Sequence, residues 1–140
     1  MQITVERDVF RLAQVFTISR GSRTEAKVLT VRITDGDVTG WGECVPYARY
    51  DETLESVAAQ IEGLSGALTR AALYDLLPAG AARNAVDCAL WDLEAKRTGR
   101  RVWELAGLTK PGPEVTGYTL SLAEPAEMDA QAASSCAKKN

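Results

Sequence analysis

The spacing of apolar residues changes from every second residue to every third or fourth at about residue 50, and this change narrows the possible folds most. Residues 27–34 alternate apolar and polar side chains, which is typical of a strand with one buried face. Asp35-Gly36 separates this run from a second β-like run at 38–43, which predicts a hairpin because glycine accepts a positive φ. With further β-like runs at 3–5 and 16–18, we expect a small antiparallel sheet of about three strands.

After residue 50 the apolar residues recur at helical spacing in two stretches. The first stripe consists of Leu54, Val57, Ala58, Ile61, Leu64 and Leu68. Asp51 or Thr53 is the candidate residue to cap its start. The second and more regular stripe consists of Ala82, Ala85, Val86, Ala89, Leu90 and Leu93. Gly99 follows it at the position of a C-terminal cap, and its alanines permit close approach of a neighbouring element. With a short helix expected over 102–107, the sequence predicts an α+β fold in which a helical bundle follows the sheet.

The last thirty residues differ from the rest in organisation. Residues 110–113 form a proline- and glycine-containing linker, and residues 115–122 alternate like a strand. Glu124-Pro125 then starts a helix that runs towards Ala133. A strand followed by a helix opens a parallel βα architecture, and one such unit cannot bury itself. We therefore expect one domain over 1–110, and a linker with the first strand-helix unit of a truncated second domain over 111–140.

The residue types present exclude several kinds of site. The chain has no histidine, so it holds no Ser-His-Asp triad, no Cys-His pair and no His-ligated zinc site. Cys44, Cys88 and Cys136 are widely spaced, which argues against a disulfide framework or a Cys-rich metal site and favours the cytoplasm. The net charge of −3 argues against non-specific nucleic-acid binding. The apolar runs are too short to predict a signal peptide or a membrane span.

Three segments closely resemble the N-terminal capping domain of the enolase superfamily, the mandelate racemase/muconate lactonizing enzyme type. They are residues 19–26 (Ser-Arg-Gly-Ser-Arg-Thr-Glu-Ala), 40–47 (Gly-Trp-Gly-Glu-Cys-Val-Pro-Tyr) and 78–92, which contains Pro-Ala-Gly-Ala-Ala-Arg-Asn-Ala. The Gly-Trp-Gly-Glu hairpin marks only the superfamily, whereas the other two segments are similar to dipeptide epimerases of the L-Ala-D/L-Glu epimerase type. The resemblance implies an α+β cap followed by a (β/α)7β barrel, of which this chain would contain only the first strand and helix.

The implied activity is epimerisation by proton transfer at the carbon next to a carboxylate. The resemblance implies that Mg2+ stabilises the enediolate intermediate and that two lysines act as acid and base. In such enzymes these lysines and the acidic metal ligands lie on barrel strands, and none can be placed in these 140 residues. We therefore expect no catalytic residue, no metal ligand and no activity in this chain alone. The implied substrate of the complete enzyme is a dipeptide, with Ala-Glu from peptidoglycan turnover as the expected example.

The resemblance places substrate contacts in two cap loops, residues 19–25 and 45–51. Arg23, together with Arg20, would bind the acidic side chain or carboxylate of the dipeptide, because a guanidinium pairs with a carboxylate bidentately. Tyr47 would line the second loop or simply cover the edge of the core. Thr119 would contact substrate from the first barrel strand. Without the resemblance, the two arginines are solvated loop residues and the threonine reflects β propensity alone.

The remaining features have structural interpretations. The Gly-Trp-Gly-Glu hairpin is interpreted as structural, because its glycines let the strands twist. Asp92 is interpreted as a packing or solvated residue, and the cysteines as small core or surface residues. The alternative to an epimerase cap is a truncated, non-catalytic cap fragment. Such a fragment would act through self-association of its exposed barrel-facing surface, or with a barrel partner in trans.

Overall fold

A computed structural model describes residues 1–66 and 68–137, without the side chains of residues 136 and 137. The side chain of Cys136 and the pair Lys138-Lys139 therefore lie outside the described part of the chain. The chain divides into two compact units. The first unit combines Met1–Val9 with Lys27–Pro111, and the second combines Phe10–Ala26 with the residues from Gly112 onward.

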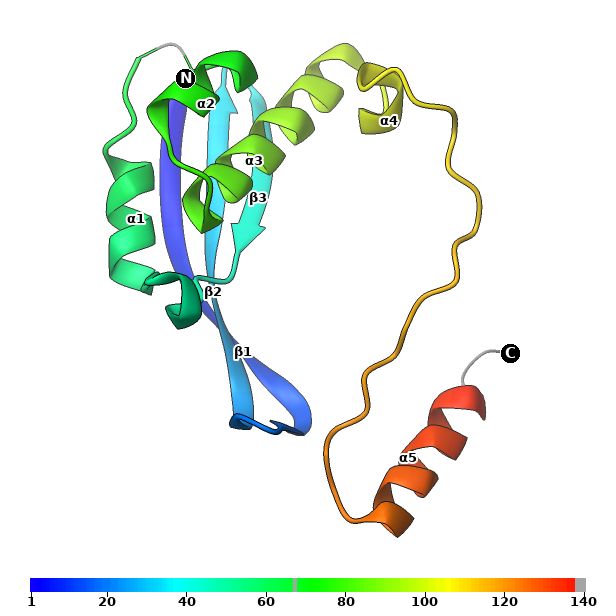
Figure 1. Cartoon of the computed structure of the whole chain (residues 1–140). Helices are drawn as coiled ribbons and strands as arrows, with labels where there is room; N and C mark the ends of the chain where they lie inside the picture. The colour runs from blue at the N-terminus through cyan, green and yellow to red at the C-terminus, as the bar shows by residue number, and fades with distance from the viewer. Residues whose placement is uncertain (67, 138–140) are drawn as a thin grey trace. The chain divides into compact units, whose positions relative to one another are not determined.

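A three-stranded sheet forms the first layer of the fold, in the order β1 (Gln2–Ile18), β2 (Gly21–Asp35), β3 (Val38–Cys44) (Figure 1). Strands β2 and β3 are antiparallel, so the prediction of a small antiparallel sheet is confirmed. The runs at 3–5 and 16–18 belong to one long strand rather than to two. The loop expected over 19–25 is wrong, because β2 already begins at Gly21. Residues 21–25 are all exposed, and a strand without a buried face carries no alternating pattern to detect.

Helices α1 (Leu54–Glu62), α2 (Arg70–Leu76) and α3 (Ala81–Thr98) cover one face of the sheet (Figure 1). The side chain of Thr53, rather than that of Asp51, caps α1 by accepting a hydrogen bond from the Ser56 N–H at 3.0 Å. The first helix ends before Leu64, and α2 was not anticipated from the sequence. The short helices η1 (Ala48–Tyr50) and α4 (Val102–Leu105) flank these elements on the chain.

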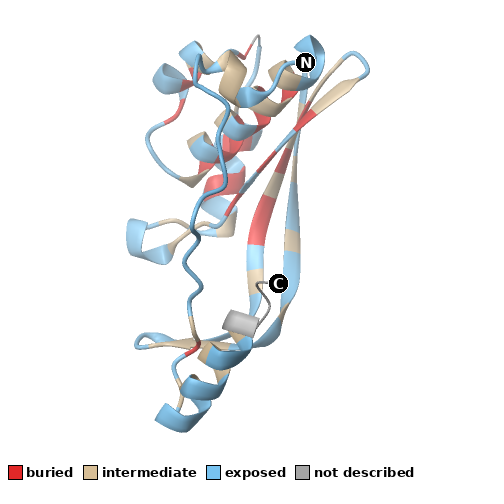
Figure 2. Cartoon of the chain, turned by 90° about the vertical axis from the view of Figure 1, so that its right-hand side faces the viewer, coloured by how far each residue is buried: buried red, intermediate tan, exposed pale blue. Residues whose placement is uncertain are grey.

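The core lies between α3 and the sheet. All six residues of the second predicted stripe are buried, as the red segments of α3 show (Figure 2). On β2, Leu29, Val31 and Ile33 are buried and pair with Cys44, Gly42 and Gly40 of β3. Because side chains alternate along a strand, these six positions share the face that α3 covers.

Two glycines of β3 bring the sheet into contact with the backbone of α3. A Cβ atom on Gly42 would lie 2.0 Å from the carbonyl oxygen of Ala85, and one on Gly40 would lie 2.1 Å from that of Ala89. No side chain fits in either space. The structural interpretation of the Gly-Trp-Gly-Glu segment and the expected close approach at the alanine stripe are therefore confirmed.

Side chains of α3 also bind the outer edge of β3. The carboxylate of Asp92 accepts a hydrogen bond from the backbone N–H of Trp41 at 2.8 Å. Lys96 donates to the carbonyl of Thr39 at 2.9 Å and pairs with Asp92 at 2.6 Å. Edge strands expose unpaired backbone groups, and these bonds satisfy two of them. Asp92 therefore has the structural role that its sequence position suggested.

The strand expected over 115–122 is wrong, because residues 112–124 form neither helix nor strand. The Leu122 N–H donates to the Thr17 carbonyl at 2.9 Å, but no ladder develops around this bond. A parallel strand needs neighbouring strands, which further βα units would supply. Helix α5 (Pro125–Ala137) begins at the expected proline. The α+β fold class is confirmed. Of the strand-helix unit expected near the C-terminus, the helix forms and the strand does not.

Candidate functional site

Tyr47 lies in the segment that joins β3 to α1. The phenol ring of Tyr47 lies 5.7 Å from that of Tyr50, measured between centroids, and Tyr50 is 72% exposed. Tyr47 is the N-cap of a single turn of 3-10 helix, and Tyr50 is the last residue of that turn. Asp51 then adopts a left-handed conformation with φ of 58°, which ends the turn. The segment therefore presents two aromatic side chains from one compact turn.

A carboxylate that the sequence did not single out holds this segment. Glu52 accepts hydrogen bonds from the N–H of Tyr47 at 3.2 Å and from the N–H of Ala81 at 2.6 Å. Residues 52 and 81 are far apart on the chain, so no spacing rule could pair them. In the sequence, Glu52 is marked out only as an acidic residue directly before Thr53, a candidate N-cap.

Arg20 and Arg23 lie at the end of the β1–β2 hairpin. Arg20 occupies the two-residue turn, and Arg23 lies three residues later in β2. Both side chains are exposed, and neither forms an ion pair within the described part of the chain. The hydroxyl groups of Thr17 in β1 and Ser22 in β2 lie 2.9 Å apart, and their hydrogen bond joins the two strands near the turn. Both guanidinium groups are therefore free to bind an external anion.

Thr119 is exposed in the extended segment that precedes α5. Its neighbour Ser121 is buried and ties this segment to β1. The Ser121 hydroxyl donates to the Val15 carbonyl at 3.2 Å and accepts from the Thr17 N–H at 2.9 Å. Thr119 thus belongs to the same compact unit as the two arginines, whereas Tyr47 belongs to the other unit.

Cys44 and Cys88 lack the electrostatics of reactive thiolates. Burial, followed by the charges of Glu52 and Glu43 and by Cys88, raises the pKa of Cys44 from 9.0 to about 11. Burial and the carboxylate of Asp87 raise the pKa of Cys88 as well. A nucleophilic cysteine needs a lowered pKa, because the thiolate is the reactive form. Both groups are therefore protonated at neutral pH.

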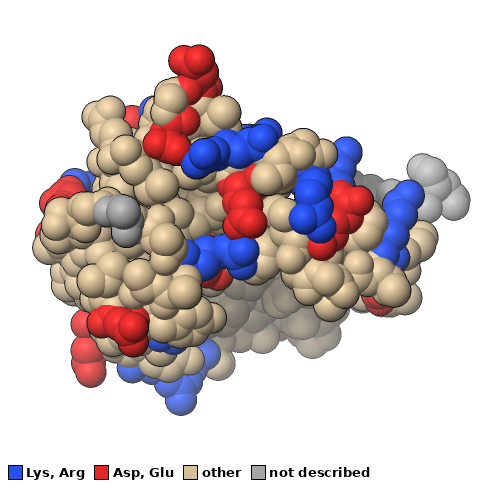
Figure 3. Space-filling model, turned by 90° about the horizontal axis from the view of Figure 1, so that it is seen from above, with Lys and Arg blue, Asp and Glu red and all other residues tan. Residues whose placement is uncertain are grey.

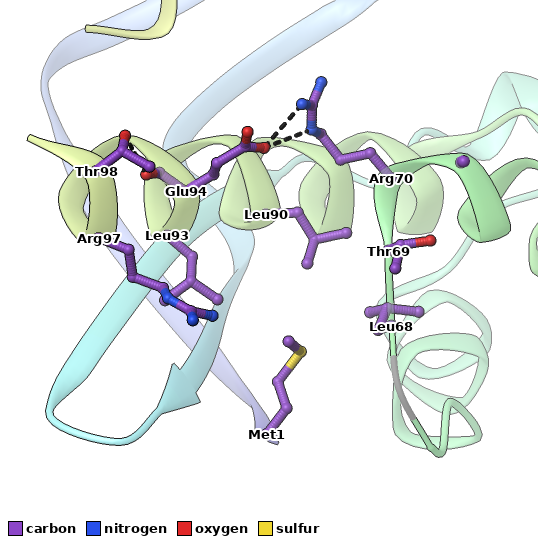
Figure 4. Close-up of a pocket in the computed structure, with 10 residues that line it drawn as sticks. Met1, Leu68, Thr69, Arg70, Leu90, Leu93, Glu94, Arg97 and Thr98 are labelled. Carbon is purple, nitrogen blue, oxygen red and sulfur yellow. Dashed lines mark hydrogen bonds and ion pairs between the residues drawn. The ribbon is translucent and has the colours of Figure 1, made fainter. Parts of the chain in front are cut away.

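A pocket of about 660 Å³ lies in the first unit, apart from every predicted site residue. Its large apolar lining residues are Met1, Leu68, Leu90 and Leu93 (Figure 4). At its rim, Arg70 binds Glu94 at 2.7 Å, and Arg97 binds Asp35 at 2.6 Å. The rim charges are thus already paired. On the face shown in Figure 3, basic and acidic side chains are likewise interspersed.

Among the described residues, no group of three Asp, Glu or Cys side chains lies close enough to hold a metal ion. Within the same residues, no helix is long and apolar enough to cross a membrane. At the positions predicted to bind substrate, the side chains are two exposed arginines, an aromatic ring and a hydroxyl group. These groups bind and orient a ligand, but they do not by themselves supply an acid–base pair.

The chain is similar to known epimerases over most of its length. It is 44% identical over 130 residues to the L-Ala-D/L-Glu epimerase of Escherichia coli, a match that covers 90% of this chain and 40% of that protein. A crystal structure of an enolase family member from Agrobacterium tumefaciens, with homology to dipeptide epimerases and with bound sodium and L-Ala-L-Glu, is 50% identical. Its TM-score is 0.88, over 94% of this chain and 42% of the other.

A second solved structure, the dipeptide epimerase of Methylococcus capsulatus with Mg and L-Arg-D-Lys, is 30% identical with a TM-score of 0.84. That match covers 97% of this chain and 42% of the other. The chain thus spans about two fifths of the length of these relatives. The family model described as mandelate racemase / muconate lactonizing enzyme, N-terminal domain, matches residues 1–107. The chain belongs to this family, the N-terminal capping domains of the enolase superfamily.

Proposed function

We propose that this chain is the substrate-specificity cap of a Mg2+-dependent dipeptide epimerase that acts on L-Ala-D/L-Glu and similar dipeptides in the cytoplasm. The observation that carries the proposal is the 50% identity and TM-score of 0.88 to an enolase family member that holds L-Ala-L-Glu. The 44% identity to a curated L-Ala-D/L-Glu epimerase supports the same substrate class. In this proposal, residues 1–110 form the cap domain, and residues 111–140 form a linker and the beginning of the barrel domain.

Within this proposal the cap binds substrate and does not carry out the proton transfer. Arg23 and Arg20 would pair with the acidic side chain or carboxylate of the dipeptide, because both guanidinium groups are exposed on one hairpin. Thr119 would contact the dipeptide from the same compact unit. Tyr47 would contribute from the segment after β3, where its ring and that of Tyr50 lie together.

The described residues do not fit a magnesium site, because they bring no three Asp, Glu or Cys side chains together. The structure from Methylococcus capsulatus contains Mg with its dipeptide, which supports the metal requirement proposed for the complete enzyme. The chain alone is expected to be inactive.

A hybrid enzyme tests the proposal directly. Residues 1–133 replace the equivalent part of the Escherichia coli epimerase, and 1H NMR in D2O follows exchange of the Glu α-proton in L-Ala-L-Glu. We expect exchange with the hybrid and Mg2+, and none with the 140-residue chain. A folded hybrid without activity on L-Ala-L-Glu would contradict the proposed substrate class, and activity of the chain alone would contradict its proposed role.

The role of Arg23 is tested in the same hybrid. Because a charge-assisted bidentate pair is lost, Arg23→Ala should lower kcat/KM for L-Ala-L-Glu by about 10- to 100-fold. Arg7→Ala, at an exposed arginine elsewhere on β1, is the matched control and should have no effect. Equal kcat/KM in the two variants would remove Arg23 from the proposed site.

A further inference from the structure

The carboxylate of Glu52 connects two elements that are distant in sequence. One oxygen, Oε1, accepts a hydrogen bond from the backbone N–H of Ala81, the first residue of α3, at 2.6 Å. The other oxygen, Oε2, accepts from the backbone N–H of Tyr47 at 3.2 Å. A single side chain therefore joins the segment after β3 to the start of the longest helix in the described chain.

Helix α3 relies on this carboxylate at its N-terminus. Gly80 occupies the N-cap position and has no side chain to accept a hydrogen bond from the first turn. The first turn also contains no acidic residue. Glu52 supplies both the missing acceptor and a negative charge at the positive end of the helix dipole. A Cβ atom on Gly80 would lie 2.8 Å from Oε1, so the absence of a side chain leaves room for the carboxylate.

The segment that carries Tyr47 folds on itself by short-range bonds. The Tyr50 N–H donates to the Tyr47 carbonyl at 2.8 Å, and the Asp51 N–H donates to the Ala48 carbonyl at 3.1 Å. These bonds shape the turn but do not tie it to the rest of the first unit. The two bonds of Glu52 do so, since one ends on the turn and the other on α3.

Residues on both sides of Glu52 fix its backbone. Asp51 is left-handed, with φ of 58°. Thr53 is the N-cap of α1 and forms a capping box with Ser56. The backbone of Glu52 is thus held between the end of one turn and the start of a helix. A side chain on a fixed backbone loses less conformational freedom when it makes its bonds.

We propose that Glu52 is a positioning residue, which holds residues 45–51 at a fixed place against α3 so that Tyr47 is preorganised for the dipeptide. This role rests on the proposed function, because the dipeptide proposed there is the substrate that Tyr47 would contact. Glu52 itself does not contact the reacting atoms. Preorganisation increases affinity by removing the cost of ordering the segment when substrate binds.

Amide hydrogen exchange of the 140-residue chain tests the anchor without any assay of activity. Glu52→Gln retains the size of the side chain but leaves one acceptor oxygen for two donors. We expect that oxygen to stay with Ala81, the shorter bond. Exchange of the Tyr47 N–H should then accelerate by about tenfold, while that of Ala81 changes by less than about threefold, in line with loss of one hydrogen bond to a charged group.

Glu55→Gln is the matched control, because Glu55 is an exposed acid in the first turn of α1. It should alter neither amide. An unchanged exchange rate of Tyr47 in Glu52→Gln would overturn the anchor. Equal acceleration of Tyr47, Ala81 and the core amides would also overturn it, because that pattern reports loss of global stability.

The effect of Glu52 on substrate binding is measured in the hybrid enzyme. Glu52→Gln should raise KM for L-Ala-L-Glu by about fivefold and leave kcat within about twofold, because preorganised binding is lost before the chemical step. A KM equal to that of the Glu55→Gln hybrid would overturn the positioning role. An inactive hybrid with Glu52 intact would instead contradict the proposed function, and hydrogen exchange would still decide whether Glu52 anchors the segment.

Discussion

Two residues of β3 without side chains determine how closely the sheet and its main helix pack. Gly42 faces the carbonyl of Ala85, and Gly40 faces that of Ala89. A contact between backbones cannot relax by rotating a side chain, so a substitution must move an entire element. The glycines are therefore required for packing at these positions rather than for turn formation.

Gly42→Ala tests this packing contact. The new methyl group would meet the Ala85 carbonyl oxygen at 2.0 Å, and separating β3 from α3 should cost about 3 kcal/mol, the upper end for overpacking. Urea unfolding followed by circular dichroism measures the change. Gly112→Ala has nothing within 4 Å of the added atom and is the neutral control. Equal unfolding free energies for the two variants would contradict the close contact.

Because of Cys44, the free energy of unfolding of the chain should decrease as pH rises through the alkaline range. Burial is the largest cause that raises its pKa to about 11, and the carboxylates of Glu52 and Glu43 add to it. In the unfolded chain the thiol ionises near pH 9, whereas the folded chain keeps it protonated up to about pH 11. The resulting stabilisation is complete below pH 9 and is lost between these values as pH rises.

The pH dependence is measured by urea unfolding at about pH 8 and about pH 10.5. The parent chain should lose about 2 kcal/mol more stability over this range than Cys44→Ala does, as expected for a pKa difference of this size. Cys88→Ala, at the exposed cysteine, should retain most of the parent's loss. The same alkaline loss in Cys44→Ala would show that other groups cause it.

At the scale of elements, the helices begin and end at residues whose side chains or conformations are suited to those positions. Thr53 caps α1, and Thr69 caps α2 by accepting from the Ala72 N–H at 3.1 Å. Gly99 ends α3 in the left-handed conformation, with φ of 66°. Helix α3 differs from α1 and α2 at its start, because its cap comes from Glu52 on another segment.

Thr53→Ala tests a cap that is local in sequence. Loss of the hydrogen bond to Ser56 should lower the unfolding free energy by about 1 kcal/mol, the usual cost of removing an N-cap threonine. The measurement is the midpoint of urea unfolding. Thr116→Ala, at an exposed threonine outside helices and strands, should change it by less than about 0.5 kcal/mol. If both variants unfold at the same midpoint, Thr53 does not stabilise α1.

At the scale of the whole molecule, both compact units expose large apolar side chains, but they differ in whether they hold the buried core. The buried hydrophobic cluster lies entirely in the first unit. In the second unit several large apolar side chains are exposed, among them Phe10, Val15, Val115, Tyr118 and Leu122. Val115 is 98% exposed. Exposed apolar side chains in one unit favour association with another surface.

Sedimentation velocity over a range of concentrations tests this expectation. The chain should form species larger than a monomer as concentration rises, because association buries the apolar side chains of the second unit. A variant with both Tyr118→Ser and Leu122→Ser should shift the distribution towards the monomer. Val45→Ser, at an exposed position of the first unit, is the control. A monomer at every concentration would contradict the self-association expected of the chain.

The sequence by itself determined the elements whose signals are local. The alternation over 27–34 and the Asp35-Gly36 turn predicted β2 and β3, and the alanine-rich stripe predicted the buried face of α3 residue by residue. These signals work because a strand or helix with one buried face must repeat apolar residues at its own period. Where no face is buried, as at 21–25, the same logic predicted a loop and was wrong.

The tertiary structure alone decided the features that join distant residues. The Glu52 carboxylate accepts a hydrogen bond from the Ala81 N–H, and the Asp92 carboxylate accepts one from the Trp41 N–H. No periodicity of apolar residues along the chain encodes either contact. The alternation over 115–122 predicted a strand, yet none forms, because a strand depends on hydrogen bonds from neighbouring strands as well as on its own residues. Local patterns report burial, whereas strand pairing and side-chain anchors depend on which segments the folded chain brings together.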